Sequence, residues 1–262
     1  MRFVADSYYR GLRAARIPAL RRRLNDAGLI LCYHNVVATE EDCAGCPGLH
    51  ESRARFERQM QWLADHYRVV GLREFIDRLT NGASVRSMAA LTFDDGYAGV
   101  FEHAVPILDA LKMPATVFIV ADAVGRAAPF AWDERAGHRT ADWATICSAL
   151  GRGIELGAHS FNHPSLPTLT DSQLEHELIT SRDVIQSATG TRPECFAYPY
   201  GHWNVRVREA VRSAGYGAGL TLDFGLNRRD TDRWALRRIN VPAGISDAAF
   251  EAWTAGCHGR TH

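Results

Sequence analysis

Short apolar runs alternate along this chain with longer segments in which apolar residues recur every three or four positions. The short runs predict buried strands and the longer segments predict amphipathic helices. Strands are expected at 29–34, 67–70, 88–93, 115–120, 153–157, 195–198, 216–222 and 237–241. Helices are expected at 53–65, 72–80, 98–111, 141–151, 171–188, 203–214 and from 246 onward, with a loop at 35–52. This alternation predicts an α/β fold with a parallel sheet closed into a barrel.

Length and composition fit one large domain. The chain has 262 residues, of which 46% are hydrophobic, and this is enough for a sizeable core. Thirty basic and thirty acidic residues give a formal net charge of zero, so no general attraction to nucleic acid is expected. We predict a basic helical segment over residues 1–27 and a single barrel domain over residues 28–262.

The first 23 residues are unusually basic. They hold seven arginines against one aspartate, Asp6, and therefore carry +6 in a chain that is neutral overall. Two interpretations stay open: this segment lies on an anionic membrane surface, or it packs one side of a solvated helix on the barrel. No apolar run of 18 residues and no signal-like N-terminus is present. The expected location is the cytoplasm, at the inner membrane surface if the first interpretation holds.

Six cysteines are present, and without an export signal they are expected to be reduced. Cys32 and Cys195 lie in apolar runs and are expected to be small core residues. Cys43 and Cys46 have the spacing of a redox or zinc motif, but no second pair accompanies them. A reactive role and an inert role for this pair both stay open.

Two adjacent carboxylates, Asp94 and Asp95, follow the predicted strand 88–93 in the sequence TFDDG. Gly96 after them permits a sharp turn. Like charges placed side by side are costly unless a positive group lies beside them. A metal ion would be such a group, whereas an ordinary turn is the other interpretation of these residues taken alone.

A pair of histidines, His159 and His163, follows another predicted strand in the sequence HSFNHP. On one helical turn, residues four apart lie on the same face and can bind one ion. Two imidazoles and a carboxylate suit zinc, cobalt or nickel and leave positions open for water and substrate. Two surface histidines before Pro164 are the alternative, but the two motifs together favour a metal site.

The chain resembles the polysaccharide deacetylases with the NodB-homology fold, carbohydrate esterase family 4. The resemblance rests on TFDDG at 92–96, HSFNHP at 159–164 and FAYPYG at 196–201, and it covers about residues 28–245. It implies an irregular (β/α)7 barrel and a divalent metal, with Zn²⁺ expected and Co²⁺ or Ni²⁺ as alternatives. By position, Asp94 would be the catalytic base, and Asp95, His159 and His163 the metal ligands. The backbone N–H of Tyr200 would stabilise the oxyanion.

Two departures from the family pattern leave roles to be filled. The third motif of the family usually carries an arginine that orients the base, and Ala197 stands there in this chain. Arg237 and Arg238 lie on a late strand, and our hypothesis is that Arg238 substitutes. The late Leu-x-His motif is also missing. The chain resembles circularly permuted members in which a histidine on the first strand is the acid, so His34 is assigned as general acid, with a buried structural histidine as the alternative.

Four aromatic residues near predicted loops, Trp132, Tyr198, Tyr200 and Trp203, are candidates to stack on sugar rings, and for Trp132 burial is an equally good interpretation. The resemblance implies a metal-dependent enzyme that removes N-acetyl groups from N-acetylhexosamine units of a glycan or glycan precursor. Two alternatives stay open: an amidohydrolase acting on small-molecule or lipid-linked sugars, and a non-catalytic carbohydrate-binding protein. The oligomeric state is not predicted.

Overall fold

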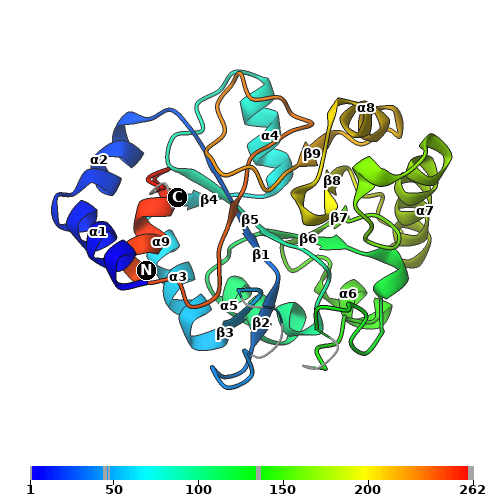
Figure 1. Cartoon of the computed structure of the whole chain (residues 1–262), viewed down its shortest axis with the longest axis horizontal. Coiled ribbons are helices and arrows are strands. Elements are labelled where there is room, and N and C mark those ends of the chain that lie inside the picture. Colours follow the sequence, from blue (N-terminus) through cyan, green and yellow to red (C-terminus); the bar gives the residue numbers. More distant parts are fainter. Residues whose placement is uncertain (1, 44–45, 47, 134–136, 259–262) are drawn as a thin grey trace.

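A parallel sheet of eight strands forms the centre of the molecule in the part of the chain that the computed structural model describes, residues 2–43, 46, 48–133 and 137–258 (Figure 1). Its strands are β1 (Leu29–Tyr33), β4 (Arg68–Val69), β5 (Met88–Phe93), β6 (Ala115–Ile119), β7 (Ile154–Ala158), β8 (Cys195–Ala197), β9 (Ala218–Leu220) and β10 (Ile239–Asn240). The order across the sheet is β10-β1-β5-β6-β7-β8-β9, and β4 pairs with the start of β5.

The sheet closes on itself just before β10. Leu220 of β9 forms a parallel bridge with Leu236, and Thr221 N–H donates to the Leu236 carbonyl at 2.8 Å. A few residues later, Ile239 of β10 pairs with Leu31 of β1. The stretch that leads into β10 therefore joins the last strand to the first, and the predicted irregular (β/α)7 barrel is confirmed.

Helices follow most strands and cover the outside of the barrel (Figure 1). They are α1 (Arg2–Ala14), α2 (Ile17–Leu24), α3 (Arg53–His66), α4 (Leu72–Thr80), α5 (Val105–Ala110), α6 (Trp143–Ala149), α7 (Asp171–Thr189), α8 (Val205–Ser213) and α9 (Asp247–Thr254). The start of α7 is fixed by a capping box between Thr170 and Gln173, and the start of α9 by the Ser246 side chain. The helix expected at 98–111 is instead a π-helical turn, Val100–Ala104, followed by α5.

Side chains on the two faces of the sheet belong to two separate apolar clusters, as strand geometry requires. Ile30, Ala90 and Phe118 point to one face and pack with Phe75 of α4. Their strand neighbours, such as Leu91, point to the other face and pack with the outer helices. The first cluster fills the barrel interior, and α4 covers the end of the barrel where the strands begin. Buried polar groups of the interior therefore gather at the opposite end, where β5 and β7 finish.

The basic N-terminal segment forms α1 and α2, which lie beside α9 on one side of the barrel (Figure 1). Tyr9 is 5% exposed, and its hydroxyl accepts a hydrogen bond from Trp253 Nε1 at 2.9 Å. Arg13 pairs with Glu251 at 3.0 Å. One face of α1 thus packs on the rest of the protein, in agreement with the second of the two interpretations. Met1 and residues 259–262 of the predicted domains lie outside the described residues.

The stretch expected to be a loop, 35–52, contains two short strands. They are β2 (Asn35–Val37) and β3 (His50–Ser52), which pair in parallel apart from the main sheet. Their polar side chains are buried, including His50 at 1% exposure. Ala44 and Gly45, which separate Cys43 from Cys46, lie outside the described residues. Both cysteines are free thiols, and their role stays open.

Candidate active site

The predicted functional residues meet at the carboxyl end of the barrel strands. Asp94 and Asp95 directly follow β5, His34 follows β1, His159 follows β7, and Tyr200 lies three residues beyond β8. In barrels of parallel strands this end carries the loops that vary with function, so it is where catalytic groups are expected. The fold therefore brings together side chains that lie up to 166 residues apart in the sequence.

Asp95, His159 and His163 form a compact buried group. Asp95 Oδ1 lies 3.5 Å from His159 Nε2 and 3.4 Å from His163 Nε2, and the two Nε2 atoms are 3.2 Å apart. All three residues are at most 7% exposed. His159 Nδ1 lies 2.8 Å from the Ala197 carbonyl, which can only accept, so this nitrogen carries the hydrogen. The lone pair of His159 Nε2 therefore faces Asp95.

This arrangement fits a divalent metal ion. Three electron-pair donors converge, and Asp95 Oδ1 has no hydrogen-bond partner among the described residues. Burial lowers the pKa of His163 to about 2, and burial also lowers the pKa of His159. Both imidazoles are therefore neutral, as metal ligands must be. Burial and the neighbouring Asp94 charge raise the pKa of Asp95 well above its usual value, a cost that a cation would offset.

The histidines are not brought together by a helix, and the predicted helical turn is wrong. The segment 159–163 is a loop in which Ser160 and His163 have φ values of 64° and 61°. Ser160 Oγ accepts the His163 backbone N–H at 2.9 Å and closes the turn. Asp95 is also left-handed, with φ 70°. Such conformations cost about 1–3 kcal/mol each and persist where surrounding contacts enforce them.

Glu177 of α7 supplies these contacts, and sequence analysis missed it. Its Oε2 accepts the backbone N–H groups of Phe161 and Asn162, each at 2.8 Å, and its Oε1 accepts Asn162 Nδ2 at 3.2 Å. Glu177 is 6% exposed. The carboxylate thus ties the loop between the two candidate ligands, His159 and His163, to helix α7. The only sequence signal was an acidic residue at an apolar position of α7.

Replacing Glu177 by alanine is expected to weaken metal binding by about 10- to 100-fold, because residues that orient metal ligands typically contribute this much. Two backbone donors lose their acceptor, and the histidine loop can relax out of its left-handed turn. Titration of the metal-free protein with Zn²⁺ against a competing chelator measures the change. Glu175→Ala, on the exposed face of the same helix, is the matched control. Equal zinc affinities in the two variants would contradict the assigned role.

Arg238 holds Asp94 with two parallel hydrogen bonds. Nη1 donates to Oδ1 and Nη2 to Oδ2, each at 2.7 Å. The arginine is fully buried in the barrel interior, where it also donates to Thr92 Oγ1 at 3.2 Å and to the Thr221 carbonyl at 2.9 Å. Of the two arginines considered, Arg237 is exposed. The bidentate contact is thus made from the residue directly before β10, while Ala197 contributes a carbonyl to His159.

Asp94 is kept ionised in this environment. Burial alone would raise the pKa of its carboxyl, but the charge of Arg238 and the hydrogen bonds that it donates bring the pKa below its ordinary value. Cys32 Sγ donates to Asp94 Oδ2 at 3.4 Å, and burial raises the pKa of this thiol well above its usual value. Cys32, expected only to fill the core, is therefore a neutral donor to the carboxylate.

His34 lies close to the same carboxylate. Side-chain atoms of Cys32, His34 and Asp94 lie within 4.8 Å of one another. Burial lowers the pKa of His34 to about 4, against an opposing contribution from the Asp94 charge. The pKa of His34 thus lies below the ordinary value of a histidine, and the side chain is neutral at pH 7. Its role as acid and the oxyanion role of the Tyr200 N–H stay predictions.

Two of the four aromatic candidates lie beside the Asp95–His159–His163 group. The ring centroids of Trp132 and Tyr200 lie 5.2 Å and 4.5 Å from that of His163, and Tyr200 is 47% exposed. Tyr198 is fully buried and donates to the Trp234 carbonyl at 2.7 Å, so it cannot stack on a sugar. Trp203 lies three residues beyond Tyr200 in the loop after β8, and its Nε1 donates to Asp223 at 3.1 Å.

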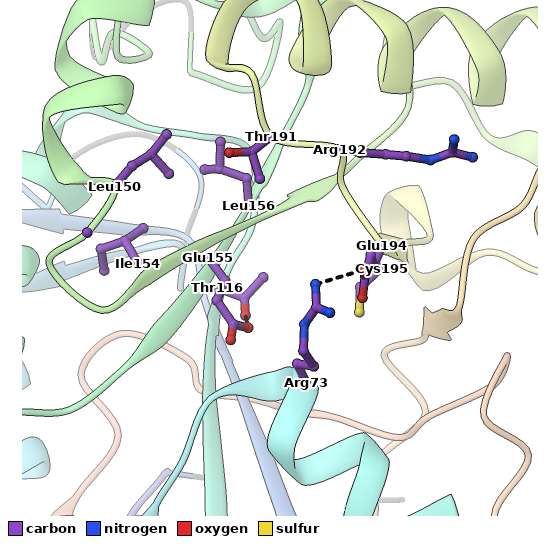
Figure 2. Close-up of a pocket in the computed structure, with 11 residues that line it drawn as sticks. Arg73, Thr116, Leu150, Ile154, Glu155, Leu156, Thr191, Arg192, Glu194 and Cys195 are labelled. Carbon is purple, nitrogen blue, oxygen red and sulfur yellow. Dashed lines mark hydrogen bonds and ion pairs between the residues drawn. The ribbon is translucent and has the colours of Figure 1, made fainter.

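A cavity of about 250 Å³ lies at the other end of the barrel, near the starts of β6, β7 and β8. Figure 2 shows Arg73 turned toward Glu194, and Arg192 pointing away from both. Arg73 pairs with Glu194 at 2.7 Å, and Thr116 donates to Glu155 at 3.0 Å. None of the predicted site residues lines it, so the candidate active site is the opposite end.

Comparison with known proteins agrees with this geometry. YxkH of Bacillus subtilis, named a polysaccharide deacetylase, is 28% identical over 226 residues, which are 86% of this chain and 75% of YxkH. A poly-β-1,6-N-acetyl-D-glucosamine N-deacetylase of Staphylococcus aureus is 25% identical over 213 residues, 76% of this chain and 69% of that protein. Both relatives therefore match most of this chain.

Solved structures show the same fold. The Streptococcus pyogenes deacetylase PplD superposes with a TM-score of 0.74 at 22% identity, over 87% of this chain and 98% of that one. IcaB from Ammonifex degensii gives a TM-score of 0.73 at 24% identity, over 88% and 98% of the two chains. The model of the polysaccharide deacetylase family, whose members are metal-dependent hydrolases, matches residues 81–219, just over half of the chain. This protein belongs to the polysaccharide deacetylase family.

Proposed function

We propose that this protein removes N-acetyl groups from the N-acetylhexosamine residues of a surface polysaccharide, with a polymer of N-acetylglucosamine as the substrate class. The observation that carries the proposal is the Asp95–His159–His163 group beside an ionised Asp94. The name of the Staphylococcus aureus relative supports the choice of polymer. A non-catalytic binding protein would have no need of buried, mutually repelling carboxylates at this position.

The chemistry divides among the residues of the site. When bound by Asp95, His159 and His163, a divalent metal supplies Lewis-acid activation of water and of the amide carbonyl; Zn²⁺ is our choice, with Co²⁺ and Ni²⁺ as alternatives. Asp94 accepts the proton of the attacking water, and Arg238 fixes the direction in which its oxygens point. The Tyr200 N–H would donate to the oxyanion that develops on the carbonyl oxygen of the acetyl group.

The low pKa of His34 constrains the last proton transfer. Because His34 is neutral in the resting site, it has no extra proton to give at the start. It lies beside Asp94, so the proton that Asp94 takes from water can reach the leaving amine through His34. The amine then departs as a neutral group, and the acetic acid formed with it gives its proton to solvent and leaves as acetate.

The substrate class is tested by measuring acetate release from β-1,6- and β-1,4-linked N-acetylglucosamine oligomers of two to eight units and from the monosaccharide. We expect release from oligomers, rising with length. Release from the monosaccharide or from a lipid-linked sugar alone would favour the alternative, an amidohydrolase for small or lipid-linked substrates. Binding of oligomers by the metal-loaded protein without any release would favour the carbohydrate-binding alternative.

We also propose that α2 contacts an anionic membrane surface from the cytoplasmic side. Ile17, Leu20 and Leu24 fall on one face of this helix and are 37%, 57% and 64% exposed. The exposed arginines Arg16, Arg21 and Arg23 surround this apolar face. Exposed apolar residues among arginines are the composition of an interfacial helix. No helix among the described residues is long and apolar enough to span a bilayer.

Sedimentation with vesicles tests this contact. The protein is expected to sediment with vesicles rich in phosphatidylserine and to stay in solution with neutral vesicles, because each arginine near an anionic surface contributes about 1 kcal/mol. Leu20→Ser with Leu24→Ser is expected to reduce binding. Val205→Ser, which removes an equally exposed apolar side chain from α8, is the control. Equal sedimentation of the protein with both vesicle types would contradict the proposal.

A further inference from the structure

A second buried polar group lies beside the metal centre, and none of the roles above uses it. Its hub is Asp133, which is fully buried. Asp133 Oδ1 accepts hydrogen bonds from His50 Nε2 at 2.9 Å and from the Cys46 backbone N–H at 3.1 Å, while Oδ2 accepts the Tyr97 hydroxyl. We call Asp133, His50 and Tyr97 the Asp133 cluster.

The cluster is locked in one hydrogen-bonding pattern. Asn35 Nδ2, which can only donate, lies 3.1 Å from His50 Nδ1, so the ring hydrogen of His50 is on Nε2 and points at Asp133. Tyr97 is fully buried, and its hydroxyl donates to Asp133. These residues come from β2, β3, the loop after β5 and the loop near residue 130. A carboxylate satisfied by three donors from separate segments fixes those segments relative to one another.

The residue that this pattern directs toward the metal centre is Trp132. Its Nε1 donates to the Tyr97 hydroxyl at 3.3 Å, and its ring stacks on Phe130 with centroids 4.7 Å apart and planes 3° from parallel. The indole then lies 5.2 Å from the His163 ring and 5.7 Å from the Tyr200 ring. Trp132 is only partly buried. One edge of the indole is thus held by the cluster, and the other borders the site.

We propose that Asp133 and Tyr97 are positioning residues that hold the indole of Trp132 as one wall of the substrate pocket, beside Tyr200. The proposal rests on the proposed function, in that the wall would contact the acetylated sugar. The Tyr97 hydroxyl is the link, because it donates to Asp133 and accepts from Trp132. Without it the indole has no described hydrogen-bond partner and can rotate away from His163.

Tyr97→Phe tests the proposal with little change in shape. We expect kcat/KM for N-acetylglucosamine oligomers to fall by about 3- to 10-fold, the usual worth of one hydrogen bond, with zinc affinity unchanged. Trp132→Ala is expected to lower kcat/KM further, and adding Tyr97→Phe to Trp132→Ala to cost nothing more. Additive effects in this double-mutant cycle would overturn the proposal. Tyr216→Phe, which removes a buried tyrosine hydroxyl far from the site, is the matched control.

A second readout does not depend on activity. The metal-loaded protein is labelled with 5-fluorotryptophan, and Trp132→Phe identifies the resonance of Trp132. Tyr97→Phe and Asp133→Asn are expected to shift or broaden this resonance, and Tyr216→Phe to leave it in place. An unchanged Trp132 resonance in Tyr97→Phe would overturn the positioning role. If the protein releases acetate from no oligomer, the proposed function fails, while the fluorine spectrum still decides the positioning role.

Discussion

Replacing Arg238 by methionine is expected to destabilise the metal-free protein by about 3–5 kcal/mol, the usual cost of removing one partner of a buried ion pair. The Asp94 carboxylate would lose both of its charged hydrogen bonds while it stays buried beside Asp95. Its pKa would then rise, because the charge of Arg238 is the main influence that opposes burial. A protonated Asp94 cannot accept a proton from water, so deacetylation should fall by about 10²- to 10⁴-fold.

The neighbouring arginine provides the control for this prediction. Arg237→Met removes the same charge and length from an exposed position and should change stability by less than about 0.5 kcal/mol. Arg238→Lys keeps the charge but loses the two-pronged contact, and intermediate activity is expected. Urea unfolding and acetate release measure the two effects. Wild-type activity in Arg238→Met would refute the assignment of Arg238 as the residue that orients the base.

Asp95→Asn is expected to abolish metal-dependent activity and, at the same time, to stabilise the metal-free protein by about 1–3 kcal/mol. Asp95 is 3% exposed, its Oδ1 has no described hydrogen-bond partner, and the charge of Asp94 opposes its ionisation. An asparagine removes this buried charge and keeps the shape. Most substitutions of buried residues destabilise, so a gain in stability here would identify a residue retained for binding an ion.

Two comparisons separate this effect from general changes in charge. Adding metal at about 100 times its dissociation constant should stabilise the wild type by about 2.7 kcal/mol and should leave Asp95→Asn unchanged. Asp230→Asn, at an exposed position, should respond to metal like the wild type. Asp94→Asn should instead lose stability, because it removes the partner of Arg238. A destabilised Asp95→Asn that still gains stability from zinc would show that the ion binds elsewhere.

Much of the fold follows from local pattern. Strand β5 and helix α4 occupy the predicted ranges, since a continuous apolar run and an apolar residue every third or fourth position are local signals. The positions of Asp94, Asp95, His159 and His163 at strand ends also followed from the order of the motifs. The π-helical turn after Gly99 could not be predicted in this way, because it packs against β2, which is distant in the sequence.

The support of the site depended on contacts between distant segments. The turn at His159–His163 is stabilised by Glu177 from α7, so the sequence HSFNHP alone suggested a helix. Neighbouring residues on a strand point to opposite faces, but pattern did not decide whether Arg237 or Arg238 faces the interior. The Asp133 cluster draws on three segments and has no sequence signature. The positions of the candidate metal ligands at one end of the barrel were thus predictable from motifs, whereas the residues that hold these ligands in place were not.

The central claim is that the Asp95–His159–His163 group and Asp94 together hydrolyse N-acetyl groups of a glycan. The most direct test is acetate release from N-acetylglucosamine oligomers by chelator-treated protein, with and without added Zn²⁺ or Co²⁺, in the wild type and in Asp94→Asn. The account predicts release that requires added metal and is lost in Asp94→Asn although that variant still binds zinc. Release that persists after chelation, or that is undiminished in Asp94→Asn, would contradict it.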